Sequence, residues 1–160
     1  MSDEIYKAIK ELPSISKTIK EYNLIAKKKL SQNFILDINL TNKIAKLSDS
    51  IKNNTVIEIG AGPGSLTRSI LLNGAKKIII IEKDERFINA LTKLNLASKN
   101  KIVIENKDAL DININDLLKK YHIDHAEIIA NLPYSIATKL LLNWIPFPQG
   151  INKMTLMFQK

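Results

Sequence analysis

The chain has 160 residues, about one domain in length, and its 45% hydrophobic and 25% charged composition is ordinary for a protein with a buried core. Its formal net charge of +8 favours a polyanionic partner, nucleic acid before a membrane surface, although the heavy use of Lys, Ile and Asn also fits an AT-rich genome. The lack of Cys excludes disulfides, thiolate nucleophiles and Cys-type zinc sites; His122 and His125 alone cannot build a histidine metal cluster, so no metal site is expected. Because no segment has the apolar core of a signal peptide or the roughly 18 apolar residues of a membrane span, we expect a soluble, cytoplasmic protein.

The first third of the chain has the pattern of amphipathic helices. Residues 3–12 repeat their apolar positions at helical spacing, and Pro13 ends that helix. Residues 16–30 are open between a second helix and a tail. Asp37 is placed to cap a further helix over 38–51.

From residue 55 onward, short apolar runs alternate with helical segments. Strands are expected at 55–60, 76–84, 101–110, 126–134 and 153–160. Helices are expected between them at 65–72, 85–98, 113–122 and 135–145. Near-continuous apolar strands that alternate with helices predict an α/β fold with a parallel, doubly wound sheet. Because no covering element follows the last strand, we expect a sheet truncated after the fifth strand, in the N-terminal portion of a longer protein.

The first strand ends in the glycine-rich segment "EIGAGPG", residues 58–64. Glycines allow backbone amides to approach a ligand without an intruding Cβ; the alternative is a tight turn that binds nothing. The spacing is G-x-G-x-G with an acid before it, which is more typical of S-adenosylmethionine enzymes than the G-x-G-x-x-G of NAD enzymes. We therefore favour a cofactor loop that includes Gly60.

The next two strands each end near a carboxylate. Glu82 closes "IIIIE" and can accept hydrogen bonds from both ribose hydroxyls of an adenosine-type cofactor. Asp108 in "ENKDAL" can accept one from the adenine amino group. The alternatives are a solvated acid at Glu82 and a simple turn cap at Asp108. Because open α/β sheets bind ligands at this edge, we expect both acids to face one ligand.

The fourth strand ends in "NLPY", Asn131 to Tyr134. Adenine N6 is a poor nucleophile because its lone pair is delocalised into the ring, and acceptors for its N–H groups would free that pair. The Asn131 side chain and the Leu132 carbonyl offer two acceptors, with Pro133 fixing the backbone beside them. Tyr134 can stack on a flipped-out base. The motif thus predicts catalysis by positioning and electrostatics, with an ordinary turn after a strand as the alternative.

Taken together, these segments resemble the ribosomal RNA adenine N6-dimethyltransferases. The resemblance covers roughly residues 26–160 and rests on "KKKLSQNFILD", "VIEIGAGPGSLT", "IIEKD", "NKDAL", "NLPYSIATKLL" and "MTLMFQK". It is closest to the bacterial small-subunit kasugamycin-sensitivity enzymes, with the erythromycin-resistance large-subunit methylases as more distant relatives. Ser31 departs from the family, which usually has Gly there.

The resemblance implies a class I S-adenosylmethionine-dependent methyltransferase (Rossmann-like) fold that dimethylates N6 of two adjacent adenosines near the 3′ end of 16S rRNA. The implied cofactor is S-adenosyl-L-methionine, and the implied partner is the small ribosomal subunit, whose assembly the family also monitors. No membrane partner is expected, and the oligomeric state is open, with a monomer as the expectation. The resemblance assigns cofactor contacts to Asn33, Ile35, Gly60, Glu82, Asp108 and Asn131, and catalysis to Asn131, Leu132, Pro133 and Tyr134.

The resemblance also divides the chain. Residues 1–25 form an N-terminal extension largely outside it, and residues 26–160 form an incomplete catalytic domain. The resemblance leads us to expect that the family's C-terminal helical RNA-binding domain, and the downstream aromatic residue on the other face of the base, lie outside these 160 residues. Lys27–Lys29 either contact phosphate beside the site or form a solvated charge run.

Four other functions share parts of this sequence pattern. An NAD-type dehydrogenase shares the glycine loop and the strand-end acid but leaves "NLPY" unexplained. A non-catalytic RNA-binding or ribosome-assembly factor on the same fold is disfavoured by the intact Asn131, Pro133 and Tyr134. A DNA adenine methylase usually carries Asp-Pro-Pro-Tyr at this position, and a 23S rRNA adenine methylase remains an alternative.

Overall fold

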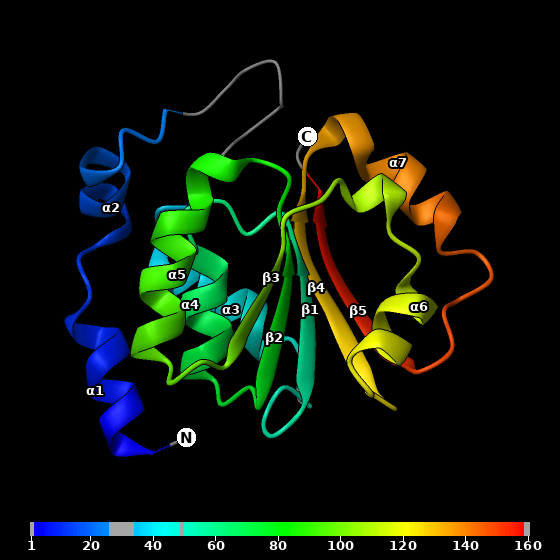
Figure 1. Ribbon diagram of the computed structural model, residues 1–160, viewed down its shortest axis with the longest axis horizontal. Coiled ribbons are helices and arrows are strands. Elements are labelled where there is room, and N and C mark those ends of the chain that lie inside the picture. The colour runs from blue at the N-terminus through cyan, green and yellow to red at the C-terminus, as the bar shows by residue number, and fades with distance from the viewer. Residues whose placement is uncertain (1, 26–33, 49, 159–160) are drawn as a thin grey trace.

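The computed structural model describes residues 2–25, 34–48 and 50–158 (Figure 1). Its centre is a parallel sheet in the order β3-β2-β1-β4-β5. The strands are β1 (Thr55–Ile59), β2 (Lys77–Ile81), β3 (Ile102–Glu105), β4 (Ala126–Leu132) and β5 (Ile151–Phe158). The predicted parallel sheet is therefore confirmed. Among the described residues, no helix has the length and apolar character needed to cross a membrane.

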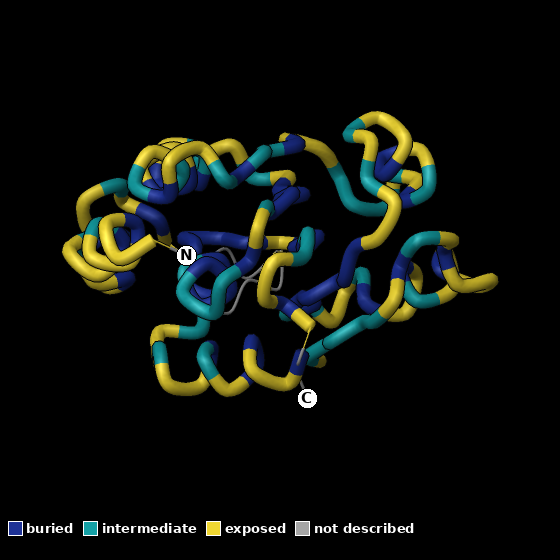
Figure 2. Tube along the Cα trace, turned by 90° about the horizontal axis from the view of Figure 1, so that it is seen from below, coloured by how far each residue is buried: buried dark blue, intermediate teal, exposed yellow. Residues whose placement is uncertain are grey.

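The sheet is buried on both faces, as the isoleucine run in β2 predicts. Ile78 and Ile80 belong to one hydrophobic cluster, and Ile79 and Ile81 belong to another on the opposite face. All four side chains are at most 2% exposed. Figure 2 shows the buried segments gathered in the middle of the molecule, with exposed backbone on the surrounding helices and loops. Helices must therefore cover both faces.

The helices form two layers around the sheet (Figure 1). One layer contains α3 (Ile38–Lys46), α4 (Ser65–Leu72) and α5 (Ile88–Ala97), and the other contains α6 (Ile114–Lys120) and α7 (Tyr134–Asn143). The expected cap of α3 is present, since Asp37 Oδ1 accepts from the amides of Asn39 at 2.8 Å and Leu40 at 3.4 Å. This cap satisfies two of the amides that a helix start leaves without an intrahelical partner.

Several elements end earlier than the apolar pattern indicates, and most of these differences fall at the carboxyl ends of the strands. Strand β2 ends at Ile81, before Glu82, and β3 ends at Glu105, well before Asp108. The residues after β3 turn into the 3-10 helix η3 (Ala109–Asp111), and another 3-10 helix, η2 (Glu85–Phe87), precedes α5. Pro133 leaves β4 and becomes the N-cap of α7, whereas α3 stops at Lys46 rather than at residue 51. The polar residues that follow these strands thus lie in loops at the carboxyl edge of the sheet.

The N-terminal arm, residues 2–25, packs onto the helical layer of α4 and α5. It contains α1 (Asp3–Glu11) and α2 (Ile15–Glu21), so the segment left open between a helix and a tail begins as a helix. Ile9 is fully buried and Leu24 is 1% exposed, and both belong to the same hydrophobic cluster as α4 and α5. Helix α1 lies along the outside of that layer in Figure 1. The arm is therefore part of the folded core.

The buried contacts of the arm predict a measurable share of stability. Ile9→Ala should lower the free energy of unfolding by about 2–4 kcal/mol, because a buried Ile leaves a cavity when it is shortened. Ile25→Ala is the matched control, since that side chain is 68% exposed, and it should change the stability by less than about 0.5 kcal/mol. Urea unfolding followed by circular dichroism measures both. Equal stability of the Ile9 variant and the wild type would show that the arm is not docked.

Candidate active site

A cavity of about 540 Å³ opens at the carboxyl edge of the sheet. A cavity of this size suits a cofactor-sized ligand, and the carboxyl edge is where open α/β sheets bind one. The chain order brings together the loops after β1, β2, β3 and β4. The lining residues that concern the site are Phe34, Ile35, Glu58, Gly60, Gly62, Glu82, Lys83, Asp84, Arg86, Lys107, Asp108, Asn131, Pro133, Ser135 and Ile136.

The glycine loop after β1 forms one wall of the cavity. Gly60 has φ +69°, a left-handed conformation, and a Cβ placed there would meet no heavy atom within 4 Å. The space beside Gly60 is therefore open to a ligand. Gly64 serves a different purpose, because a Cβ there would lie 3.3 Å from side-chain carbons of both Leu91 and Leu94. Gly60 thus leaves room for a ligand, and Gly64 allows α4 and α5 to pack closely.

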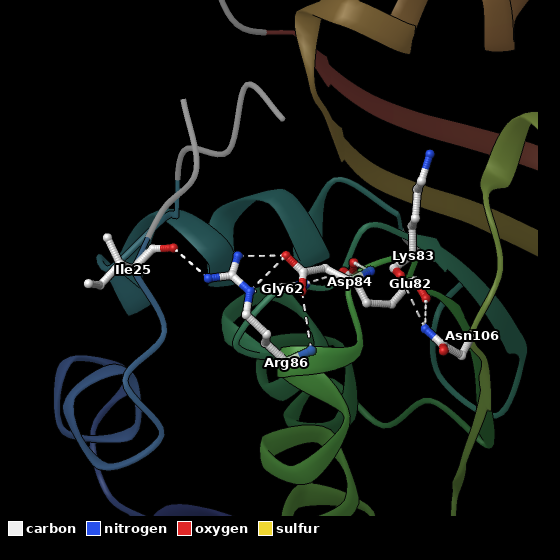
Figure 3. Close-up of polar contacts among 7 residues, drawn as sticks. All are labelled: Ile25, Gly62, Glu82, Lys83, Asp84, Arg86 and Asn106. Carbon is white, nitrogen blue, oxygen red and sulfur yellow. Dashed lines mark hydrogen bonds and ion pairs between the residues drawn. The ribbon is translucent and has the colours of Figure 1, made fainter. Parts of the chain in front are cut away.

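Glu82 connects the loops that follow β1 and β2 (Figure 3). Its side chain accepts from the Gly62 amide at 2.9 Å on Oε2 and from the Asp84 amide at 2.8 Å on Oε1. Glu82 is 6% exposed, and burial raises the pKa of its carboxyl group while these amides oppose that rise. Each carboxylate oxygen has two lone pairs, so both oxygens can still accept from a ligand. The predicted ribose acceptor therefore lines the cavity and is held in place by the backbone.

Asp108 both caps a turn and lines the cavity, so the turn cap is present and the contact with adenine stays a prediction. Its Oδ1 accepts from the Leu110 amide at 3.0 Å at the start of η3. Its Oδ2 lies 2.6 Å from Lys83 Nζ, and this lysine is the main reason that the pKa of Asp108 is lowered. A ligand amino group must therefore share Oδ2 with Lys83 or displace it.

Glu58 is a lining residue to which the sequence interpretation gave no role. It is 1% exposed, and neither carboxylate oxygen has a hydrogen-bond partner among the described residues. Burial raises its pKa to about 8, although the nearby hydroxyl and amide of Thr67 oppose this rise. At neutral pH the free protein therefore holds Glu58 largely protonated. A cationic group in the cavity would favour its ionised form.

The "NLPY" residues divide between the cavity and the surface. Asn131 and Pro133 line the cavity. Leu132 is fully buried, backbone included, and is not among the residues that line the cavity. Tyr134, the first residue of α7, is 76% exposed and lies outside the cavity lining. An exposed ring beside the mouth can stack on an incoming base, and the roles assigned to these four residues stay predictions.

The segment before α3 closes part of the cavity. Ile35 lines it, as expected, whereas Asn33 and Lys27–Lys29 lie outside the described residues. Phe34 also lines it and packs edge-on against Phe87, with 5.5 Å between ring centroids. A Cβ at Gly62 would lie 3.6 Å from the Phe34 ring. Phe34 therefore covers the glycine loop from outside.

The sequence model described as "Ribosomal RNA adenine dimethylase" matches residues 23–160 of the chain. The chain belongs to the ribosomal RNA adenine dimethylase family. It is 43% identical over 156 residues to the "Ribosomal RNA small subunit methyltransferase A" of Bradyrhizobium diazoefficiens, a match that covers 96% of this chain and 54% of that protein. The protein of the same name from Rhodopseudomonas palustris strain TIE-1 is 44% identical, with 96% and 53% covered. The chain thus spans about half the length of these curated relatives.

Solved structures of related proteins have the same fold. A dimethyladenosine transferase from Plasmodium falciparum superposes with a TM-score of 0.64 at 30% identity, over 78% of this chain and 42% of that one. The 23S rRNA methyltransferase ErmE superposes with a TM-score of 0.65 at 24% identity, over 79% and 48%. The second likeness supports the fold alone. These structures agree with the class I methyltransferase fold predicted for this family member.

Some lining residues of this dimethylase-family chain carry no clear signal in the sequence. Phe34 lies between the predicted cofactor contacts Asn33 and Ile35, and Ile136 lies in "NLPYSIATKLL", but the sequence assigned no role to either residue. Ser135 also lines the cavity, and the sequence indicates this only by placing Ser135 directly after "NLPY". Glu58 was detectable, since a carboxylate inside a buried apolar strand requires an explanation.

The raised pKa of Glu58 predicts a pH-dependent stability. The unfolded state loses the Glu58 proton near its ordinary value of 4.5, whereas the folded state keeps it to about 8. Between these values the folded state binds more protons, so this group's contribution to stability falls as pH rises, by at most roughly 1.4 kcal/mol per pH unit. Glu58→Gln should therefore unfold at a higher temperature than the wild type at pH 8.5 and at a similar temperature near pH 5.

Thermal unfolding across that pH range, with Glu85→Gln on the cavity rim as the control variant, measures this effect. A constant difference between Glu58→Gln and the wild type at every pH would show that Glu58 does not titrate as the burial requires.

Proposed function

We propose that this chain forms the S-adenosyl-L-methionine-binding and catalytic part of an enzyme that dimethylates N6 of two adjacent adenosines near the 3′ end of 16S rRNA. The main support is the clustering of Gly60, Glu82, Asp108 and Asn131 around one cavity. The names of the bacterial relatives specify a small-subunit rRNA methyltransferase. They favour small-subunit over large-subunit rRNA, and an enzyme over a non-catalytic assembly factor.

The cofactor would lie across the strand ends. Glu82 accepts hydrogen bonds from the ribose hydroxyls through the lone pairs that its backbone donors leave free. Asp108 accepts from the adenine amino group at Oδ2, beside or instead of Lys83. The open space at Gly60 lets the chain of the ligand pass close to the backbone. Glu58 lines the cavity and has no hydrogen-bond partner among the described residues, so its carboxylate would pair with a cationic group of the ligand.

Catalysis would depend on how Asn131 and its neighbours hold the target base. When bound, S-adenosyl-L-methionine supplies a methyl group whose bonding electron pair stays with sulfur as the N6 lone pair forms the new N–C bond. Asn131 Oδ1 and the Leu132 carbonyl accept from N6 and so favour a pyramidal nitrogen with an available lone pair. The N6 proton leaves to solvent as positive charge builds on nitrogen, so no strong base is needed. Pro133, with φ −60°, holds this turn, and the exposed Tyr134 stacks on the base.

The substrate would be held by its phosphates as well as by its base. The chain has a formal net charge of +8, and Lys83 and Lys107 stand on the lining of the cavity. Lysines contact phosphates without reading sequence, so they would position RNA while the "NLPY" turn receives the base. The proposed partner is the small ribosomal subunit in the cytoplasm, with the protein acting as a monomer.

The first test is ligand choice. The chain should bind S-adenosyl-L-methionine in isothermal titration calorimetry and should not bind NAD. Both ligands carry an adenosine for Glu82 and Asp108, but the glycine loop has the spacing G-x-G-x-G and not the G-x-G-x-x-G of NAD enzymes. Asp108→Ala should raise the Kd about tenfold, the loss expected for a hydrogen bond to a charged group. Asp124→Ala, an exposed acid away from the cavity, is the control and should bind like the wild type. Binding of NAD in place of the methyl donor would contradict the proposal.

The second test separates binding from chemistry. Asn131→Ala should keep the Kd for S-adenosyl-L-methionine within about threefold and lower methyl transfer by about a hundredfold or more, as for the loss of a group that acts in the transition state. Radiolabelled methyl transfer to small ribosomal subunits that lack the modification measures this under single-turnover conditions. Large subunits form the comparison substrate. Unchanged transfer by the variant would remove Asn131 from catalysis.

A further inference from the structure

The sequence contains two arginines, Arg68 and Arg86, and each donates to a backbone carbonyl of the N-terminal arm. Arg68 Nη1 donates to the Pro13 carbonyl at 2.8 Å, and Arg86 Nη1 donates to the Ile25 carbonyl at 3.0 Å. Most cations of this chain are lysines, which lack the planar fork that bonds two acceptors at once. The arm is therefore held at two points by arginines, whose planar guanidinium group can bond to two separate acceptors at once.

Arg86 continues from the arm into the cavity (Figure 3). Its Nε donates to Asp84 Oδ1 at 2.9 Å and its Nη2 to Asp84 Oδ2 at 2.6 Å, in a two-pronged ion pair. The Asp84 side chain is only 8% exposed, so this charge needs its cation. The Asp84 amide in turn donates to Glu82, which also accepts from Gly62. Hydrogen bonds therefore run without interruption from the arm to the glycine loop.

Arg68 has no comparable continuation. It lies on α4 and does not line the cavity. Its Nε has no hydrogen-bond partner among the residues that the structure describes, and burial lowers its pKa. Within the described part of the chain, Arg68 thus secures the arm without a polar connection to Glu82. The two arginines form a natural matched pair, one connected to the cavity and one not.

We propose that Arg86 is a positioning residue for Glu82, and that through it the N-terminal arm becomes a structural part of the ligand pocket. The guanidinium neutralises Asp84 beside Glu82 and fixes the loop whose amide holds the Glu82 carboxylate. Without it, two neighbouring carboxylates would face each other with their cation removed. The Asp84 loop would then shift, and Glu82 would lose its orientation toward the ligand. The ligand named in the test rests on the proposed function, whereas the hydrogen-bonded chain itself exists without a ligand.

The test compares Arg86→Met with Arg68→Met by two readouts. Isothermal titration with S-adenosylhomocysteine should give a Kd about tenfold weaker for Arg86→Met and within twofold of wild type for Arg68→Met. Amide hydrogen exchange of the free protein, followed by NMR, should show faster exchange at Gly62 in Arg86→Met alone. Both variants should lower the unfolding temperature, because both loosen the arm. Arg86→Lys can pair with Asp84 or with the Ile25 carbonyl but not with both in the same geometry, so its Kd should lie between.

Each result decides the proposal. Wild-type affinity and unchanged Gly62 exchange in Arg86→Met would overturn it, as would equal weakening by Arg68→Met, which would point to general loosening of the arm. If Arg86→Met does not fold, Arg86→Lys takes its place in both measurements. A wild-type protein that fails to bind S-adenosylhomocysteine would count against the proposed function. Gly62 exchange would still confirm or overturn the connection to the arm.

Discussion

The Glu82 carboxylate accepts hydrogen bonds from the loops that follow two different strands, and the shape of the cavity depends on both. The Gly62 amide belongs to the glycine loop after β1, and the Asp84 amide belongs to the turn after β2. Each such bond to an ionised group is worth about 1.5–3 kcal/mol, against a burial that disfavours the charge. The cavity is thus assembled before any ligand arrives, which reduces the ordering that binding would otherwise require.

Three of the carboxylates that line this cavity meet three different electrostatic environments. Glu58 is buried without a hydrogen-bond partner among the described residues, Glu82 is buried with two backbone donors, and Asp108 is paired with a lysine at the rim. Their pKa values therefore move apart, upward for the first two and downward for the third. Neutralisation, backbone bonding and ion pairing are the three ways in which a protein accommodates acids close to one another. The arrangement places an uncharged acid deep in the cavity and an ionised one at the entrance.

Sequence reasoning reached the fold and much of the site because both follow from local patterns. The isoleucine run indicates a strand buried on both faces, and parallel strands bring Gly60, Glu82, Asp108 and Asn131 to one edge. It did not reach contacts that join distant parts of the chain. The bond from Arg86 to the Ile25 carbonyl joins the strand ends to the arm across 61 positions of the sequence, and no periodic pattern predicts it. The strand ends were missed because polar residues there can either extend a strand or leave it.

The isoleucines of β2 have a consequence for how the sheet finds its alignment. A strand that is apolar on both faces gains almost as much burial after sliding by one position as before, so hydrophobicity alone does not select its register. The charged residues at the two ends of the strand must therefore select the register. Lys77 is half-buried at one end, and Glu82 follows the other end, where it accepts from the Gly62 and Asp84 amides. A slip by one residue would draw one of these charges into the apolar interior and move Glu82 away from the Gly62 amide on the neighbouring loop. The Glu82 carboxylate, which shapes the cavity, would then also fix the register between β1 and β2 during folding.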